Sequence, residues 1–373
     1  MESPADLSEK KMELAPIHIC ILYGGKSGEH EVSLKSAASV VKNLDPSKYL
    51  VTAIGIDKAG RWHLQETIVS TMMPGQGDTL SIVPSSHPVS IVPSDGIHES
   101  SGRLVIDCVF PVLHGDFGED GTMQGLLELA GLPYVGAGVL GSAASMDKET
   151  AKRLWRDAGL PIVDFEVIHQ ASTSEERKAA GARLGWPLFV KPCSAGSSLG
   201  ASRVAHESEL DAALAHALQF DTRALLERYV DAREIECAVI GNAKPQAYVP
   251  GEIIPDKSHG FYDYDAKYTD PDGAKLVAEA SLDAATRERI MRTAEGAYSV
   301  VRCEGMARVD FFLERGTNAL FLNEINTIPG FTNISMFPRM CEASGLAYPD
   351  LLNTLIALAL QRAEVRKSLH YQN

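Results

Sequence analysis

Closely spaced cysteines are missing from this sequence, although it has six cysteines among its 373 residues. No Cys-x-x-Cys pair occurs, so the spacing suits neither a zinc site nor a disulfide scaffold. Basic residues are outnumbered: 35 Lys and Arg stand against 49 Asp and Glu, a net charge of −14. This balance argues against nonspecific binding to nucleic acid, although a local basic site for phosphates is compatible with it.

Long hydrophobic runs are missing as well. The N-terminal stretch 1–16 has acids and lysines but no apolar segment of the kind found in signal peptides. The longest apolar run, at 351–360, is interrupted by Asn353 and is too short to span a bilayer. We therefore expect a cytoplasmic protein with reduced thiols that neither enters a membrane nor binds nucleic acid.

Strands and helices alternate in the first third of the chain. After the tail at 1–16, which we expect to be flexible, a strand at 17–25 runs into glycines, and a helix with apolar spacing follows at 32–44. Further strands and a helix that Asp120 would cap continue this alternation. The pattern predicts a parallel, layered α/β domain over 17–138. Within it, the Ser/Pro-rich segment 74–96 is predicted to be a loop.

The rest of the chain has a different pattern. Short strands and two helices, the first capped by Asp147 or Ser145, predict a smaller α+β unit over 139–229. The segment 230–373 is mostly strands up to a helix near 283–301, and it ends in another helix. Between those helices, two strands are joined by a short turn that contains Gly316, which predicts a β-hairpin.

The predicted hairpin has the strongest chemical pattern. Residues two apart share a face of a strand, so Arg308 points with Asp310, and Glu324 points with Asn326 on the partner strand. Two carboxylates and an amide are oxygen ligands of the kind that Mg²⁺ takes together with substrate phosphates. A general acid–base pair would leave the amide unexplained, and a solvated sheet face is the simplest alternative.

A second pattern is the loop KPCSAGSSLG at 191–200. Its small residues allow backbone amides to approach an anion, and Ser197 and Ser198 could add hydroxyl donors. Most glycine loops of this kind are only hairpin turns. Lys191 is more informative, because a lysine on an apolar strand usually meets a negative partner, and Lys148 could be a second such lysine.

The third pattern is GGKSGEHEVSL at 24–34, where a glycine pair opens a helix. This arrangement could bind an anion or a small molecule, but Glu29 and Glu31 could equally be first-turn acids that complement the helix dipole. His114, in a loop next to acids, is either catalytic or simply a hydrogen-bonded structural residue.

These pieces, in this order, resemble the D-alanine–D-alanine ligases of the ATP-grasp superfamily over about residues 17–360. The motifs that carry the resemblance are GGKSGEHEVSL, HGDFGEDGTMQGLLELAGLPYVG, SMDK, VKPCSAGSSLG, FYDYDAKY, RVDFF and NEINTIPGFTNIS. The resemblance implies a three-domain ATP-grasp fold, α/β and α+β, with a lid loop at 256–275. The implied units are the tail 1–16, an N-terminal α/β substrate-binding domain 17–138, a central subdomain 139–229 and a C-terminal domain 230–373.

The resemblance also implies the ligands of each site. Two Mg²⁺ ions (or Mn²⁺) that bridge the ATP phosphates would be held by Asp310, Glu324 and Asn326. ATP itself would be bound by Lys148, Lys191, Lys267, Ser198, Glu227, Glu234 and the backbone near Tyr229 and Val230. Homologues further suggest a homodimer.

The implied reaction joins two D-alanines through an acyl phosphate. Glu29 would receive the ammonium of the first D-alanine, and Ser197 and Tyr268 would complete a hydrogen-bonded chain with it. The remaining implied roles are oxyanion stabilisation by Arg308 and the Gly330 amide, contact with the second carboxylate by Ser335, and a place near the second substrate for His114. A ligase that makes D-alanine–D-lactate or D-alanine–D-serine, and a non-catalytic ATP-grasp module, are the alternatives; Tyr268 favours the dipeptide, and the intact site set favours an enzyme.

Overall fold

The computed structural model describes residues 15–370 except for 69, 74–76, 86–87 and 257–272. Its N-terminal sheet has the order β3-β2-β1-β9, with β1 (Ile17–Gly24) parallel to both β2 (Tyr49–Ile56) and β9 (Cys108–Val112). The predicted parallel α/β layer at the start of the chain is therefore confirmed. Its other elements are β3 (Trp62–Gln65), α1 (His30–Asn43) and α2 (Thr122–Leu129).

Two details of this region were predicted wrongly. The segment 74–96 is not a continuous loop, because it contains β5 (Gly77–Leu80), paired with β4 (Ser70–Met73), and β6 (Ser90–Val92). These strands are only three or four residues long, too short for a clear apolar alternation. Strand β6 belongs to a separate three-stranded sheet with β7 (Gly96–Glu99) and β8 (Gly102–Arg103).

The second detail is the cap of α2. The N-cap residue is Gly121 at φ +94°, a left-handed conformation that Asp rarely adopts, and not Asp120. Asp120 instead accepts hydrogen bonds from the amides of Phe117 and Thr122, both at 2.9 Å, just before the helix. The acid therefore stabilises the loop that leads into α2.

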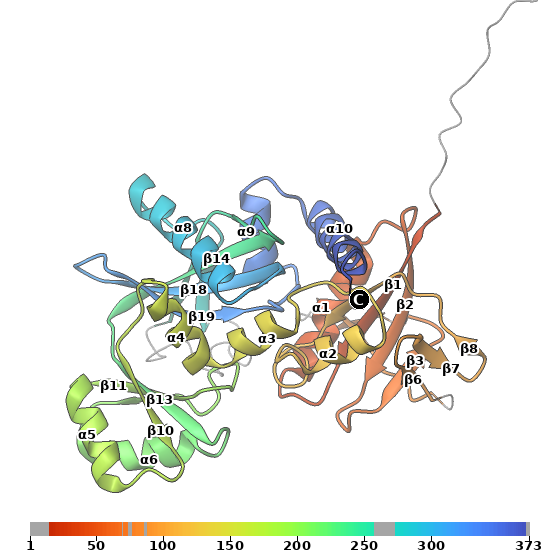
Figure 1. Cartoon of the computed structure of the whole chain (residues 1–373). Helices are drawn as coiled ribbons and strands as arrows, with labels where there is room; N and C mark the ends of the chain where they lie inside the picture. The colour runs from red at the N-terminus through yellow and green to blue at the C-terminus, as the bar shows by residue number, and fades with distance from the viewer. Residues whose placement is uncertain (1–14, 69, 74–76, 86–87, 257–272, 371–373) are drawn as a thin grey trace, which may run out of the picture.

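A separate antiparallel sheet has the order β10-β13-β11-β12. Its strands are β10 (Phe165–His169), β13 (Arg223–Arg228), β11 (Leu188–Pro192) and β12 (Ser202–Val204), and its helices are α5 (Ser174–Leu184) and α6 (Glu207–Ala217). It has its own apolar core. Figure 1 shows this unit projecting from the rest of the molecule, to which α3 (Val139–Met146) and α4 (Lys148–Asp157) connect it. Asp147, as predicted, caps α4 by accepting from the Thr150 amide at 2.7 Å.

The largest sheet has the order β17-β16-β14-β18-β19, with β15 paired to β14. The predicted hairpin is confirmed as β18 (Gly305–Glu314) and β19 (Leu320–Asn326), and Gly316 in its turn has φ +81°. The other strands are β14 (Ala232–Gly241), β15 (Gln246–Ala247), β16 (Gly251–Pro255) and β17 (Ala274–Val277), and the helices are α8 (Ala284–Val300), α9 (Met336–Ala343) and α10 (Tyr348–Lys367).

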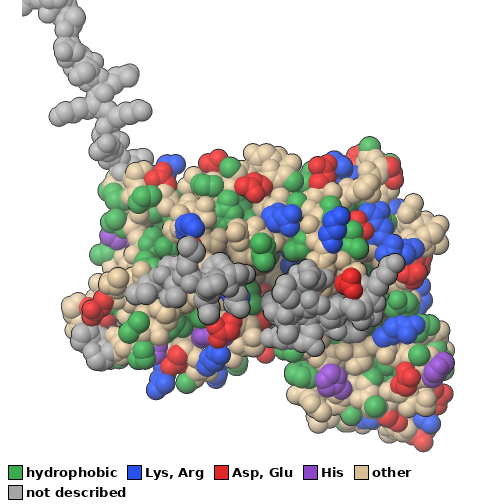
Figure 2. Space-filling model, turned by 180° about the vertical axis from the view of Figure 1, so that it is seen from behind, with side chains coloured by type: hydrophobic (Ala, Val, Ile, Leu, Met, Phe, Trp, Pro, Cys, Tyr) green, Lys and Arg blue, Asp and Glu red, His purple; other side chains and the backbone are tan. Residues whose placement is uncertain are grey.

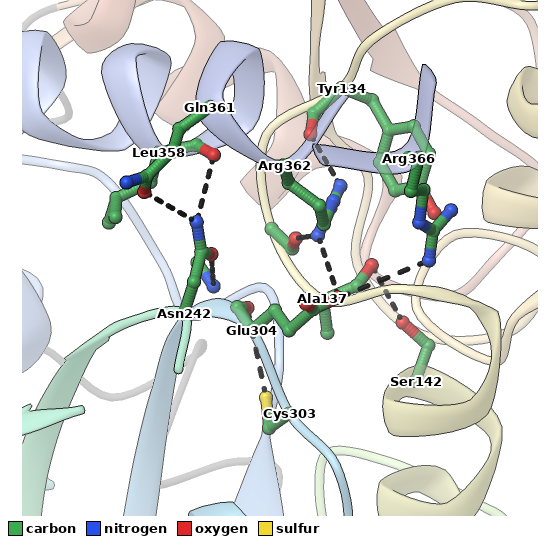
Figure 3. A network of polar contacts seen from close by, with 12 residues as sticks. Tyr134, Ala137, Ser142, Asn242, Cys303, Glu304, Leu358, Gln361, Arg362 and Arg366 are labelled. Carbon is green, nitrogen blue, oxygen red and sulfur yellow. Dashed lines mark hydrogen bonds and ion pairs between the residues drawn. The ribbon is translucent and has the colours of Figure 1, made fainter. Parts of the chain in front are cut away.

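Helix α10 joins this sheet to the N-terminal unit. Its buried Arg362 donates to the carbonyls of Tyr134, at 2.7 Å (Figure 3), and Gly136. Arg366 of the same helix pairs with Glu128. One apolar core runs through both units, from Phe110 in β9 to Leu351 in α10. The two units are therefore packed as one body, with the cavity described below at their junction with the projecting unit.

Two further properties concern the surface and the helices. On the face shown in Figure 2, acidic and basic side chains are interspersed. Within the described residues, no single helix is long and apolar enough to cross a membrane; only α9 and α10 together, which meet at a bend of 104°, reach that length and composition.

Candidate active site

A cavity of about 1010 Å³ opens between the three sheets. It brings together sixteen residues that the sequence analysis singled out: Glu29, His114, Lys148, Lys191, Ser197, Ser198, Glu227, Tyr229, Val230, Glu234, Arg308, Asp310, Glu324, Asn326, Gly330 and Ser335. They come from segments as distant as α1 and the turn after β19. Lys267 and Tyr268, also predicted for this site, lie outside the described residues.

Glu29 lies at the N-terminus of α1 in a niche made by two glycines. Its Oε1 accepts a hydrogen bond of 2.5 Å from the Ser197 hydroxyl, across 168 residues of sequence. A Cβ atom at Gly115 would lie 2.9 Å from Glu29 Oε2, and one at Gly196 would lie 3.4 Å from it. Glycine is thus required at position 115, where φ is also +71°. The niche holds a carboxylate that suits a small ammonium group.

Glu31, the neighbouring acid, has different surroundings. The sequence left open whether Glu29 and Glu31 bind a ligand or only complement the helix dipole, and the structure separates the two. Glu31 forms a 2.9 Å ion pair with Lys58, and both side chains are more than half exposed. Glu31 is therefore an ordinary surface acid in the first turn of the helix, whereas Glu29 faces the cavity.

A cluster of two lysines and one glutamate lies at the cavity wall, where Lys191 and Glu227 line the cavity. Lys191 Nζ is 2.8 Å from Glu227 Oε2 and donates to Asn323 Oδ1 at 2.9 Å. Lys152 Nζ is 2.7 Å from Glu227 Oε1, with its side chain completely buried. The sequence analysis missed Lys152, although it lies one helical turn after Lys148 among the buried positions of α4. We call Lys152, Glu227 and Lys191 the lysine cluster.

The charges of the lysine cluster do not balance. Burial by itself would raise the pKa of the Glu227 carboxyl, but the two ammonium groups outweigh that effect and lower it to about 2. Burial lowers the pKa of Lys152, an effect that the charge of Glu227 opposes. With both lysines protonated, the cluster keeps one positive charge, which suits an anionic ligand such as a phosphate.

A second group of charges is centred on the β18–β19 hairpin. We call it the arginine cluster, and it consists of Arg308, Asp310, Glu236, Glu324 and Lys148. Arg308 donates through Nε and a terminal nitrogen to both oxygens of Asp310, each at 2.7 Å, and its Nε lies 3.1 Å from Glu236. Asp310 pairs in register with Glu324, and Arg308 with Asn326. Arg308 and Asp310 thus share a face, as the strand alternation predicts. Lys148 Nζ lies 3.6 Å from Glu324.

The oxygen atoms of this face fit a divalent cation. Among the described residues no group of three or more His, Cys, Asp or Glu side chains could hold a metal on its own. The face nevertheless offers two carboxylates from paired strand positions and the nearby Asn326 amide. Magnesium usually takes one or two protein carboxylates and completes its shell with water and substrate phosphates, so this donor set is sufficient for it.

His114 and Glu119 are buried beside the Glu29 niche. Burial lowers the pKa of His114, whose Nδ1 lies 2.9 Å from the Ile328 carbonyl oxygen. Burial and the charge of Glu29 raise the pKa of Glu119 to about 8, and its Oε1 accepts from the Gly115 amide at 2.8 Å. Glu119 was not singled out by the sequence analysis, because its place in the motif HGDFGEDG gives no sign that it is buried.

The other predicted residues line the rest of the cavity. The Tyr229 amide donates to the Pro187 carbonyl at 3.2 Å, and Arg203 lies over the Tyr229 ring, 4.8 Å from its centroid. Glu234 lies on β14, paired with Ile253 and Phe312. The Ser335 hydroxyl accepts from the Thr332 amide at 3.1 Å, close to Gly330, where an added Cβ would come within 2.8 Å of it.

Comparison with known proteins gives consistent matches along the chain. The family model described as D-ala D-ala ligase N-terminus matches residues 18–137, and the one described as D-ala D-ala ligase C-terminus matches 154–357. A D-alanine–D-alanine ligase A of Bradyrhizobium diazoefficiens is 45% identical over 365 residues, covering 95% of this chain and 97% of the relative. A D-alanine–D-alanine ligase of Treponema denticola is 45% identical over 370 residues, covering 95% and 98%.

Solved structures agree with the sequence matches. The D-alanine–D-alanine ligase of Coxiella burnetii superimposes with a TM-score of 0.81 at 39% identity, covering 94% of this chain and 96% of the other. The VanG D-Ala:D-Ser ligase of Enterococcus faecalis also gives a TM-score of 0.81, at 34% identity, covering 92% and 99%.

Proposed function

The chain belongs to the D-alanine–D-alanine ligase family and has its ATP-grasp fold, and from this we propose that it joins two D-alanine molecules into D-alanyl-D-alanine while ATP is converted to ADP and phosphate. The dipeptide would serve peptidoglycan precursor synthesis. One observation carries the proposal beyond family membership. The same cavity holds a carboxylate niche for an ammonium group, at Glu29, and walls suited to phosphates and a divalent cation, at the lysine and arginine clusters.

The first step is phosphorylation of the first D-alanine. Glu29, held by Ser197, binds its ammonium group, which leaves its carboxylate directed toward the nucleotide. A carboxylate oxygen attacks the γ-phosphate of ATP and the bond from this phosphate to the β-phosphate oxygen breaks. The products are ADP and the acyl phosphate of D-alanine. Lys191 and Lys148 offset the phosphate charge and Ser198 donates a hydrogen bond to it, so the step depends on positioning and electrostatics rather than on a protein nucleophile.

The metal site belongs to this step. Asp310, Glu324 and Asn326 would hold two Mg²⁺ (or Mn²⁺) ions, whose charge would offset that of the ATP phosphates when bound. Asp310 is already paired with Arg308, so it would serve both partners. Glu227, Tyr229, Val230 and Glu234 are proposed to receive the adenosine part.

The second step is acyl transfer. The amine of the second D-alanine attacks the acyl carbon, a tetrahedral intermediate forms, and phosphate leaves with the oxygen that came from the first D-alanine. Arg308 and the Gly330 amide would stabilise the oxyanion, and Ser335 would contact the second carboxylate. The acyl phosphate must be shielded from water, and the proposed lid at 256–275, with Lys267 and Tyr268, lies mostly outside the described residues.

The assay that tests this function uses the purified protein with ATP, Mg²⁺ and one amino acid at a time. D-Alanine should yield ADP, phosphate and the dipeptide, whereas L-alanine should yield none of them. ATP turnover without any dipeptide would overturn the proposal. Because the VanG structure is titled a D-Ala:D-Ser ligase, D-serine belongs in the same assay, together with D-lactate. Preferential use of either as the second substrate would change the product but not the family.

The cellular setting is also proposed. We place the enzyme in the cytoplasm as a homodimer, where ATP is available and its six buried free cysteines stay reduced. Sedimentation of the purified protein would test the dimer. We also propose, from family membership, that the chain divides into three domains at residues 138 and 229. Each proposed domain contains one of the three larger sheets.

A further inference from the structure

We propose that Ser36 and His114 are positioning residues for acyl transfer, because together they hold the turn that presents the Gly330 amide to the cavity. This inference rests on the proposed function, in which that amide stabilises the oxyanion. Ser36 lies on α1, and nothing in its sequence context singles it out. It is completely buried, and it touches two groups far away in the sequence.

The contacts of Ser36 reach the turn by two routes. Its hydroxyl oxygen accepts a hydrogen bond of 3.2 Å from the Phe331 amide, across 295 residues. The same hydroxyl lies 3.3 Å from Nε2 of His114, whose Nδ1 lies 2.9 Å from the carbonyl oxygen of Ile328. Ser36 therefore holds the residue after Gly330 directly, and through His114 it holds the turn two residues before Gly330.

The directions of these hydrogen bonds follow from the partners. A carbonyl oxygen only accepts, so His114 Nδ1 carries a proton and donates it to Ile328. The Phe331 amide only donates, so the Ser36 hydroxyl accepts it and keeps its own proton for Nε2 of the imidazole. Burial lowers the pKa of His114, which is consistent with a neutral ring. Both ring nitrogens are then engaged, and neither is available to take a proton from a substrate amine.

The rest of the turn is held just as firmly. The Ile328 amide donates to Asn326 Oδ1 at 3.1 Å, and the Tyr348 hydroxyl donates to the Phe331 carbonyl at 2.5 Å. Ile328 and Phe331 are buried, whereas Gly330 is partly exposed and lines the cavity. Within the described residues, the Gly330 N–H has no hydrogen-bond acceptor of its own. The turn thus has its flanking groups fixed and one donor left for a ligand.

The variant Ser36→Ala separates this role from a general contribution to stability. It removes both contacts and leaves the Gly330 amide itself unchanged. Loss of an oxyanion donor lowers kcat by about 10²–10³-fold, so a displaced donor should lower the rate of dipeptide formation by about 10–100-fold. In a rapid-quench single turnover, ADP should form at nearly the wild-type rate while the dipeptide lags, and KM for ATP should stay unchanged.

Ser33→Ala is the matched control. Ser33 is also a completely buried serine of α1, and its hydroxyl also makes two hydrogen bonds, to the Gly24 amide and the Val112 carbonyl, but none to the turn. It should lower stability to a similar degree while ADP and dipeptide still form together. Ser36→Thr, which keeps the hydroxyl, should recover at least part of the acyl-transfer rate.

Two outcomes for Ser36→Ala would overturn the inference. One is a Ser36→Ala enzyme in which ADP and dipeptide formation slow equally; the other is one that matches Ser33→Ala in every rate. The proposed function fails separately, and only if the wild-type protein itself makes no dipeptide from ATP and D-alanine. His114→Asn, which can keep one hydrogen bond, should resemble Ser36→Ala if His114 acts through position, and should abolish dipeptide formation at every pH if it is the base.

Discussion

The lysine cluster and the arginine cluster line one cavity but are built in opposite ways. The lysine cluster is almost completely enclosed and has two positive charges for one negative charge. The arginine cluster is more open and has three carboxylates, Asp310, Glu236 and Glu324, for two cations, Arg308 and Lys148. Each cluster thus has one charge left over, of opposite sign. A site built for a metal–nucleotide complex needs both signs, one for the phosphates and one for the metal.

The two clusters also differ in what their ion pairs do. Breaking a buried pair leaves a charge without compensation inside the protein, so the lysine cluster contributes to folding as well as to binding. In the arginine cluster Arg308 contacts both Asp310 and Glu236, so Asp310 can also contact a cation without leaving Arg308 unpaired. Changes in the first cluster should therefore affect stability and affinity together, and changes in the second should affect turnover alone.

The largest effect is expected for Glu324→Gln. It removes a carboxylate from the proposed metal site, so Mg²⁺ should bind more weakly and offset less of the charge on the phosphoryl group, and kcat should fall by about 10²–10³-fold. A Mg²⁺ titration of the rate would measure the loss, and the melting temperature should be unchanged. A variant with normal activity at every Mg²⁺ concentration would show that Glu324 is not a ligand of the proposed metal site.

The next effect is expected for Lys152→Met, which leaves the lysine cluster neutral. Removing one partner of a buried ion pair costs about 3–5 kcal/mol, and Lys191 remains to reduce that loss to about 2–3 kcal/mol. Affinity for ADP should fall at least tenfold while affinity for adenosine stays the same, as calorimetry can show. The double variant Lys152→Met/Glu227→Gln restores the positive charge, so its affinity for ADP relative to adenosine should recover. Equal losses for ADP and adenosine would contradict the charge argument.

A pH effect follows from Glu227. Its folded-state pKa of about 2 lies below the ordinary value of 4.5, so its stabilisation is present above pH 4.5 and is lost as pH falls toward 2. A shift of this size corresponds to a contribution of about 3–4 kcal/mol, because one pKa unit is equivalent to about 1.4 kcal/mol. Urea unfolding of the wild type should lose stability in this window, and Glu227→Gln should lose less. Parallel curves for the two proteins would show that the lysines do not hold the carboxylate in its charged form.

The smallest effect is expected at the surface, where Glu31 and Lys58 form an exposed pair. Glu31→Ala should change the free energy of unfolding by less than about 0.5 kcal/mol and leave kcat unchanged. This variant sets the baseline for both clusters. A large loss of activity would mean that the niche at Glu29 extends to Glu31.

The sequence predicted those parts of the site that follow from local geometry. Strand alternation placed Arg308 beside Asp310, and a turn residue located the hairpin, because a period of two and a turn glycine depend on nearby residues only. The resemblance to a known family supplied distant pairs such as Glu29 and Ser197. Residue properties alone could not have paired them.

The sequence did not predict three of the buried polar residues. Lys152 and Ser36 look like ordinary helix residues, and their roles come from partners on β13 and on the turn after β19, more than 70 residues away. Glu119 is similar, because its burial depends on packing between separate segments. The role of such a buried polar residue can be inferred only when the fold shows its hydrogen-bond or ion-pair partner.

The most direct test of the account follows an oxygen atom. D-Alanine labelled with ¹⁸O in its carboxylate is incubated with the enzyme, ATP and Mg²⁺, and the phosphate released is examined by mass spectrometry. An acyl phosphate transfers one carboxylate oxygen to phosphorus. One phosphate should therefore be released for every dipeptide formed, and that phosphate should contain one ¹⁸O atom. Phosphate without the label, released alongside dipeptide, would contradict attack of the D-alanine carboxylate on ATP.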